Sequence, residues 1–210
     1  MAGIYIHIPF CHHKCNYCNF FSTASRRNHE ALTEALKLEM EQKKDYLKEE
    51  PVDTLYVGGG TPSILNASDL AGILRKAFDT FPFSSHPEVT LEANPEDISS
   101  ELIRRWKGAG INRLSMGVQS FYDDDLHYLS RLHNGNDALK ALEMISNAGF
   151  ESFNIDLIFG IPGLTDENWL SNLKRLTRLN VPHISAYSLT VEPKTALQHL
   201  IQKGSMKEPD

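Results

Sequence analysis

Three cysteines lie close together near the start of the chain, and the rest of the sequence has none. Cys11, Cys15 and Cys18 have the spacing C-x3-C-x2-C and follow a short apolar run at Ile4–Ile8. An odd, tightly grouped set argues against a disulfide framework and indicates metal ligation. An iron–sulfur cluster normally takes four thiolates, so three would leave one iron open to an outside ligand. The spacing favours such a cluster, and the alternative is a zinc site completed by a nearby histidine.

Later strand-like segments carry polar or glycine residues in their C-terminal halves or just beyond them. Because the C-terminal ends of parallel strands meet at one edge of a sheet, we expect these residues to share a site. They are Gly58, Gly59, Gly60 and Thr61 after the second segment, Glu92 in the third, Gln119 at the end of the fourth and Asp156 in the fifth.

The glycine run and the two carboxylates each have a structural interpretation beside a functional one. Gly58–Gly60 suits either a tight turn or a backbone that approaches a ligand closely, and no Walker motif follows it. Glu92 and Asp156 lie in otherwise apolar segments, where a carboxylate needs a partner. That partner is either a cation, Arg113 or Arg131, or the hydroxyl groups of a ribose.

Strand and helix patterns alternate along the whole chain. Short β-branched or apolar runs bounded by Gly, Pro, Asn or Asp predict six strands, at Ile4–Ile8, Thr54–Val57, Val89–Ala93, Arg113–Val118, Ser152–Ile158 and His183–Leu189. Amphipathic patterns between them predict five helices, at Asn28–Leu47, Ser68–Phe81, Ser99–Lys107, Asn136–Ala148 and Asp166–Leu179.

This alternation predicts an α/β fold with a parallel sheet and right-handed crossovers. Either an open doubly wound sheet or a barrel fits this pattern. Eight units of a barrel would need about 250 residues, so six units in 210 residues favour a partial (βα)6 parallel barrel, or a barrel whose remainder is missing. The chain ends in a polar stretch without a closing strand, which suggests the N-terminal part of a longer protein. We therefore expect residues 1–195 to form the barrel and residues 196–210 to begin a connector to a missing C-terminal region.

Composition narrows the class of protein further. The chain is 41% hydrophobic and 23% charged, which excludes a disordered or collagen-like chain. A net charge of −6 makes the chain a poor candidate for binding nucleic acid. No run of about 18 apolar residues spans a membrane, and the N-terminus resembles neither a signal peptide nor a transit peptide. We expect a cytoplasmic protein.

The motifs together resemble a known family. C-x3-C-x2-C after a first strand, with an aromatic residue before the last cysteine, is similar to the radical S-adenosylmethionine (SAM) superfamily. Further segments resemble its oxygen-independent coproporphyrinogen III oxidase-like family, and the resemblance covers nearly the whole chain. These segments are Tyr5–Cys11, Gly58–Pro62, Leu91–Pro95, Gly117–Phe121 and Asp156–Gly163.

The resemblance implies cofactors and roles for individual residues. Cys11, Cys15 and Cys18 would hold a 4Fe-4S cluster, whose free iron would chelate SAM. Reduction of the bound sulfonium would release a 5′-deoxyadenosyl radical, chemistry that the cofactors carry while the protein orients them and excludes water. Gly58, Gly59, Gly60 and Thr61 would contact the methionine part of SAM, and further cofactor contacts would come from Tyr5, Tyr17, Glu92, Gln119, Arg131, Asp156 and Ile158.

One position separates the branches of this family. The true oxidase has a further cysteine two residues after the third, and this chain has Phe20 there. The resemblance is therefore to the heme chaperone branch, whose members are implied to bind heme and pass it to apo-proteins, and which need an electron donor for the cluster. Association with a membrane would be peripheral and through the acceptors. The alternative is a radical SAM enzyme, either the oxidase or a methyltransferase-like relative.

Overall fold

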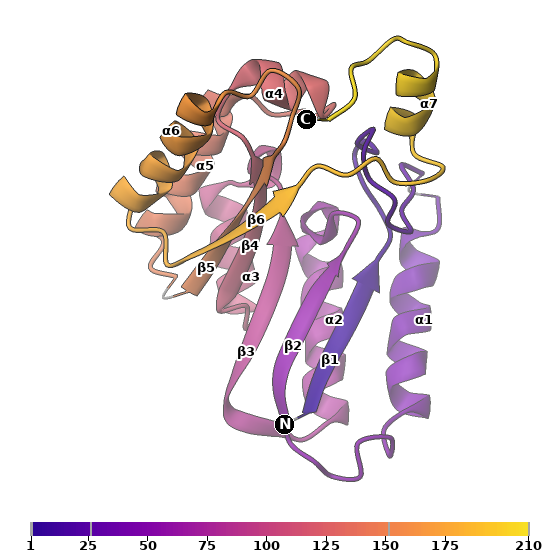
Figure 1. The fold of residues 1–210 in the computed structure, drawn as a ribbon. Coiled ribbons are helices and arrows are strands. Elements are labelled where there is room, and N and C mark those ends of the chain that lie inside the picture. The colour runs from indigo at the N-terminus through magenta and orange to yellow at the C-terminus, as the bar shows by residue number, and fades with distance from the viewer. Residues whose placement is uncertain (1, 26, 151, 210) are drawn as a thin grey trace.

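Six parallel strands form the centre of the molecule. The computed structural model describes residues 2–25, 27–150 and 152–209. The strands follow one another in a single sheet in chain order, and the sheet curves around an inner face (Figure 1). They are β1 (Ala2–Ile8), β2 (Val52–Gly59), β3 (Phe83–Ala93), β4 (Arg113–Gln119), β5 (Ser152–Phe159) and β6 (His183–Ser188). The predicted α/β partial barrel is confirmed.

Helices connect the strands and cover the outer face of the sheet (Figure 1). Every strand pairing is parallel, as right-handed crossovers through helices require. The α-helices are α1 (His29–Gln42), α2 (Ala67–Thr80), α3 (Ser100–Gly108), α4 (Asp123–Tyr128), α5 (Gly135–Asn147), α6 (Asp166–Arg178) and α7 (Ala196–Gln202), with short 3-10 turns η1 (Pro62–Ile64) and η2 (Pro95–Asp97).

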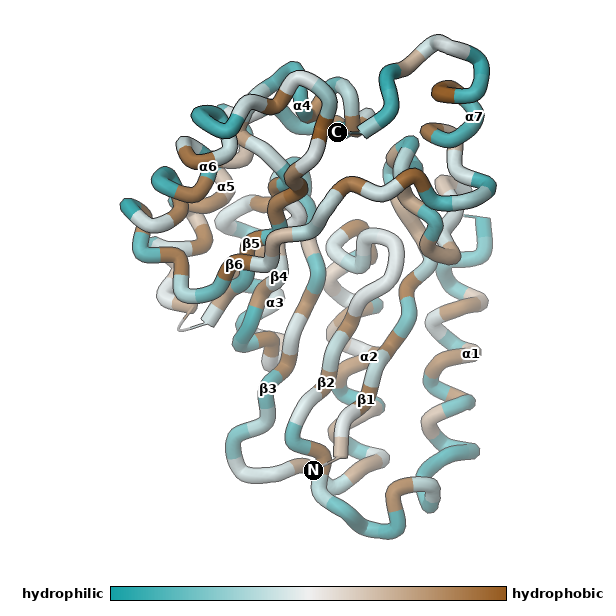
Figure 2. The backbone as a smooth tube through the Cα atoms, in the orientation of Figure 1, coloured by the Kyte–Doolittle hydropathy of each residue, from teal (hydrophilic) through white to brown (hydrophobic). Residues whose placement is uncertain are grey.

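The hydrophobic core lies between the sheet and these helices. Successive strand residues point to opposite faces, and one alternate set is apolar and fully buried, as Leu114 and Met116 of β4 illustrate. The helices add residues such as Ile73, Trp106 and Leu142 to the same cluster. Hydrophobic residues recur along the strands in Figure 2. Among the described helices, none is both long enough and apolar enough to cross a membrane.

Several details of the predicted elements were wrong. Strand β3, for example, begins at Phe83, six residues before the predicted start at Val89. Helix α1 ends at Gln42, because turns follow it and Lys48 and Glu49 adopt positive φ. Helix α2 spans Ala67–Thr80, so it begins and ends one residue before the predicted Ser68–Phe81. Helices α4 and α7 were not predicted, since both are shorter than the windows in which helical periodicity is visible.

The C-terminal segment returns to the loop between β1 and α1 that carries Cys11, Cys15 and Cys18, the cysteine loop. After β6 the chain crosses the carboxyl ends of the strands and forms α7 beside the loop that follows β1 (Figure 1). The Leu197 amide donates to the Asn16 carbonyl at 2.8 Å, and Asn19 donates to Glu192 at 2.9 Å. Residues 196–209 therefore pack against the loop that carries the cysteines, although the domain boundary after residue 195 stays a prediction.

Candidate functional site

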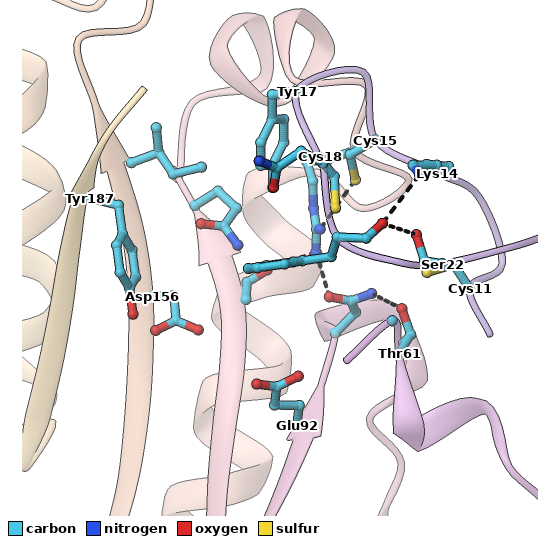
Figure 3. A pocket seen from close by; sticks show the side chains of 18 of the residues that line it. Cys11, Lys14, Cys15, Tyr17, Cys18, Ser22, Thr61, Glu92, Asp156 and Tyr187 are labelled. Atoms are coloured by element: carbon cyan, nitrogen blue, oxygen red, sulfur yellow. Dashed lines mark hydrogen bonds between the residues drawn. The ribbon is translucent and has the colours of Figure 1, made fainter. Parts of the chain in front are cut away.

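A cavity of about 410 Å³ lies at the carboxyl ends of the strands. The cysteine loop forms one side of it and the sheet forms the other (Figure 3). The segment after β6 contributes Leu189, Thr190 and Glu192 to its lining. The strand ends thus meet at one cavity, where the sequence predicts the polar residues to converge.

The loop between β1 and α1 brings the three thiols to this cavity. Cys11, Cys15 and Cys18 all line it, and their sulfurs lie on its loop side (Figure 3). Backbone hydrogen bonds shape the loop: the Cys11 amide donates to the Thr23 carbonyl at 3.0 Å, and the Cys18 amide donates to the Cys15 carbonyl at 3.2 Å. Across residues 2–25, 27–150 and 152–209, no three His, Cys, Asp or Glu side chains are arranged to hold a single metal ion.

The glycine run lets the end of β2 lie against the cysteine loop. A Cβ atom on Gly60 would be 2.6 Å from the Phe10 carbonyl oxygen and 2.9 Å from the Cys11 sulfur. The next residue, Thr61, donates its amide to the same Phe10 carbonyl at 2.7 Å. Any larger residue at position 60 would displace the loop that carries the thiols, so the close approach itself requires glycine.

Two carboxyl groups lie on the sheet side of the cavity (Figure 3). Glu92 accepts from the Tyr56 hydroxyl at 2.7 Å and from the Gly59 amide at 2.9 Å. Asp156 accepts from Asn154 at 2.7 Å. Burial raises the pKa of both carboxyls, and their hydrogen bonds only partly oppose that effect.

Neither carboxyl has the arginine salt bridge that the sequence left open. Within the described residues, no ion pair joins Glu92 or Asp156 to a cation. Arg113 lies near Glu88 instead, at 3.7 Å. Arg131 binds other groups. Two partly buried carboxyls that lack a cation and line a cavity are placed to accept hydrogen bonds from a polar ligand.

Gln119 combines backbone strain with an unpaired polar atom. Its φ is +68°, in the left-handed region that few residues other than glycine adopt. Its side chain lines the cavity, and in the described part of the chain its Oε1 has no hydrogen-bond partner although it is buried. Strained residues and unpaired buried polar atoms both concentrate at functional sites.

Arg131 joins the sheet to the cysteine loop. Its Nη2 donates to Asn94 Oδ1 at 2.6 Å and to the Gly117 carbonyl at 2.8 Å, while Nη1 donates to the Cys15 sulfur at 3.5 Å. Burial alone would lower the pKa of Arg131, but its electrostatic interactions with Tyr17, Cys15 and Glu96 raise it on balance. The guanidinium therefore stays charged beside a thiol and stabilises negative charge on that sulfur.

The cavity collects most of the residues that the sequence singled out, and two lie outside its lining. Tyr5 is 58% exposed on the open edge strand, where its hydroxyl bonds His7 at 3.2 Å. Gly58 packs under Glu92 without lining the cavity. The residues that line it are Cys11, Cys15, Tyr17, Cys18, Gly59, Gly60, Thr61, Glu92, Gln119, Arg131, Asp156 and Ile158.

Sequence reasoning missed several residues that position this set. Tyr56 holds Glu92, Asn154 holds Asp156, and Asn94 holds Arg131. A usable signal exists for one of them, because Asn154 precedes Asp156 by two positions in one strand and so shares its face. Tyr187 also lines the cavity, from the end of β6.

A family model described as the Radical SAM superfamily matches residues 5–176. The chain belongs to the radical SAM superfamily. The superfamily implies a 4Fe-4S cluster and SAM, and the cavity has a donor set that fits such a pair. Three thiols lie opposite two carboxyls, and Gln119 adds an orphaned buried amide oxygen.

Proteins named as heme chaperones resemble this radical SAM chain. Heme chaperone HemW of Haemophilus influenzae is 39% identical over 92% of this chain and 52% of its own length. The Bacillus subtilis and Escherichia coli proteins of the same name are 39% and 37% identical, over 56% and 52% of their lengths. The chain therefore spans about half the length of the curated relatives that it matches.

Solved structures show the same fold. Coproporphyrinogen III oxidase (HemN) from Escherichia coli, described as a radical SAM enzyme, matches with a TM-score of 0.87 and 31% identity, over 99% of this chain and 48% of that one. Elp3 from the archaeon Methanocaldococcus infernus matches with a TM-score of 0.72 at 18% identity, over 98% of this chain and 50% of that one, a likeness of fold alone.

Proposed function

We propose that this chain is the cluster- and SAM-binding part of a heme chaperone. The observation that carries the proposal is the identity of 37–39% to three HemW heme chaperones across 92–100% of the chain. The architecture of the cavity is consistent with it, because the thiols, the carboxyls and the strained Gln119 lie in one place.

The cysteine loop would hold the cluster. Cys11, Cys15 and Cys18 would each bind one iron as thiolates, and the fourth iron would remain open for SAM. Burial raises the pKa of the Cys18 thiol, and the nearby positive charge of Lys14 opposes that effect. Arg131 donates to the Cys15 sulfur and would stabilise the thiolate there. When bound, the cluster would deliver an electron to the sulfonium of SAM.

The sheet side of the cavity would bind the rest of SAM. Glu92 and Asp156 would accept hydrogen bonds from ribose hydroxyls, which are neutral donors and suit carboxyls that lack a cation. Gln119 Oε1 would gain the hydrogen bond that it lacks. Gly59, Gly60 and Thr61 would present backbone polar groups to the methionine part of SAM. Tyr17 and Ile158 would exclude water. Tyr5 and Gly58 lie outside the lining, so any contribution they make to SAM binding would be indirect.

Phe20 favours a chaperone over the oxidase. The side chain is 66% exposed at the cavity and supplies no thiol. An oxidase is the second candidate, because the HemN structure matches nearly the whole chain with a TM-score of 0.87. The proposal also includes heme as the cargo, heme-accepting apo-proteins and an electron donor as partners, and a cytoplasmic location.

The experiment separates the two candidates. Because the chain covers about half of its relatives, the longest form of the protein that the gene encodes is reconstituted anaerobically with iron and sulfide. Heme is then titrated and followed by its Soret band, and coproporphyrinogen III is offered separately with SAM and a reductant. Stoichiometric heme binding, transfer of heme to an apo-protein and no loss of coproporphyrinogen III are expected.

The Cys15→Ala variant is the matched control, because it removes the cluster and leaves the rest of the chain unchanged. Formation of protoporphyrinogen IX by the wild type, and its absence in this control, would assign the protein to the oxidases instead.

A further inference from the structure

Two side chains of one short loop fix the end of β4. Arg131 donates to the Gly117 carbonyl at 2.8 Å. His133 Nε2 bonds the next carbonyl, that of Val118, at 3.0 Å. Two successive peptide groups just before Gln119 are thus bound by side chains that lie two residues apart in the sequence.

The same carbonyl closes a tight turn around Gln119. The Ser120 amide donates to the Val118 carbonyl at 2.9 Å, across a single residue. With φ of +68° at Gln119, this is the rare and strained form of the γ-turn. The pairing of β4 with β5 also shifts register between Gly117 and Gln119. Such a conformation persists only where surrounding contacts determine it.

His133 is suited to hold this turn because both of its ring nitrogens are hydrogen-bonded. Its side chain is fully buried, and its Nδ1 lies 3.1 Å from Glu96 Oε2. A carbonyl only accepts, so Nε2 must carry a proton to bind Val118. Nδ1, on the other side of the ring, faces Glu96 and joins it to the same imidazole.

Glu96 is the carboxylate that this arrangement needs. Burial alone would raise the pKa of Glu96, but the hydrogen bond from His133 and the charge of Arg131 lower it on balance, so the group is ionised near neutral pH. Glu96 belongs to η2, which follows β3. The pair therefore ties the end of β3 to the end of β4, behind the cavity.

Neither member of this pair lines the cavity that holds the thiols and Gln119. We propose that His133, paired with Glu96, is a positioning residue for Gln119: it fixes the Val118 carbonyl, and thereby the strained turn that presents the Gln119 amide to the ligand. The proposal rests on the proposed function only in naming SAM as that ligand.

The test is a double-mutant cycle between His133 and Gln119. The affinity of cluster-loaded protein for SAM is measured at equilibrium in the wild type, His133→Gln, Gln119→Ala and the double variant. His133→Gln is expected to weaken binding by about tenfold in the wild-type background and to have little effect once Gln119 is alanine. An equal loss of affinity in both backgrounds would overturn the proposal.

A second measurement does not depend on SAM. Hydrogen exchange at the Ser120 amide is expected to be faster in His133→Gln and in Glu96→Gln than in the wild type, because the carbonyl that this amide binds is no longer fixed. Asn112→Ala is the control, since Asn112 makes comparable bonds to Val89 and Pro87 at the far end of the sheet. Unchanged exchange at Ser120 in both His133 and Glu96 variants would contradict the proposal.

The two measurements separate the failure of this proposal from the failure of the proposed function. A wild-type protein that binds no SAM would remove the proposed function, while faster Ser120 exchange in His133→Gln would still support the role of His133 in the turn.

Discussion

The two faces of the curved sheet differ sharply in what they bury. On the helix-facing side, the alternate residues Leu55, Leu91 and Leu114 are fully buried among other apolar side chains. On the inner side, neighbouring strand positions carry Glu92, Asp156 and other polar groups. Parallel barrels usually fill this inner space with branched apolar residues.

The outer face of the sheet therefore stabilises the fold, and the inner face forms the binding site. Apolar burial on the outer face is the main source of folding free energy, since each fully buried aliphatic side chain contributes about 1.5–3 kcal/mol. The inner face holds groups whose charge is disfavoured by burial, as the raised pKa values of Glu92 and Asp156 indicate. Mutations on the two faces should therefore change different observables.

The largest effect is expected from loss of one thiol. Cys15→Ala should reduce the iron bound after anaerobic reconstitution to near background, because the remaining two thiolates cannot hold a cubane that needs three. The unfolding midpoint of the metal-free protein should stay nearly constant, since this side chain is only partly buried. Iron and sulfide analysis and urea unfolding give the two readouts. Normal iron content in this variant would contradict the assignment of Cys15.

The reverse outcome is expected on the outer face. Leu114→Ala should lower the free energy of unfolding by about 2–5 kcal/mol, because it leaves a cavity in a fully packed core. Iron binding per folded molecule should remain normal. Urea unfolding followed by circular dichroism measures the first quantity, and a loss of less than about 0.5 kcal/mol would mean that Leu114 is not tightly packed.

A matched pair of glycine variants sharpens the comparison. Gly60→Ala places a Cβ atom 2.6 Å from the Phe10 carbonyl, so it should displace the cysteine loop and weaken SAM binding by about tenfold or more. Gly108→Ala at the end of α3 meets no atom within 4 Å and should be neutral or stabilising by up to about 1 kcal/mol. Equal effects of the two variants on SAM affinity would argue against close approach at Gly60.

The smallest effect is a pH dependence. The folded state raises the pKa of Asp156 above its ordinary value of 3.8, chiefly through burial. A carboxyl of this kind favours folding less as pH rises through the raised pKa, because the folded state then has to give up its proton.

Asp156→Asn removes that titration. It should therefore raise the thermal midpoint of the ligand-free protein at about pH 8 and give a smaller gain at about pH 4. SAM affinity should fall in the same variant, since an amide is a weaker acceptor than a carboxylate. Thermal scans at several pH values provide the test, and a gain that is independent of pH would contradict the stated cause.

The sequence was sufficient for the features that repeat. Strand and helix periods predicted the parallel α/β sheet, and the rule that sites lie at the C-terminal strand ends brought Glu92, Gln119 and Asp156 to one edge. The cysteine spacing predicted that Cys11, Cys15 and Cys18 act together as ligands. Each of these signals is local, so it can be read from a short stretch of residues.

Features that depend on distant contacts could not be predicted in this way. The C-terminal segment packs on the cysteine loop through Glu192, Leu197 and Met206, which are more than 170 positions away from their partners in the chain. Arg131 was one of two cations considered as a partner of Glu92 or Asp156, but it binds Asn94, the Gly117 carbonyl and the Cys15 sulfur. No period or motif identifies such partners, because each contact exists only after the strands have assembled.

The central claim is that the polar end of the inner face holds a 4Fe-4S cluster with an iron open to SAM. The most direct measurement is electron paramagnetic resonance of the anaerobically reconstituted and reduced chain, with and without SAM, together with iron, sulfide and zinc analysis. The account predicts iron and sulfide in similar amounts and a spectrum that changes when SAM is added. Zinc without sulfide, or a cluster signal that SAM leaves unchanged, would contradict it.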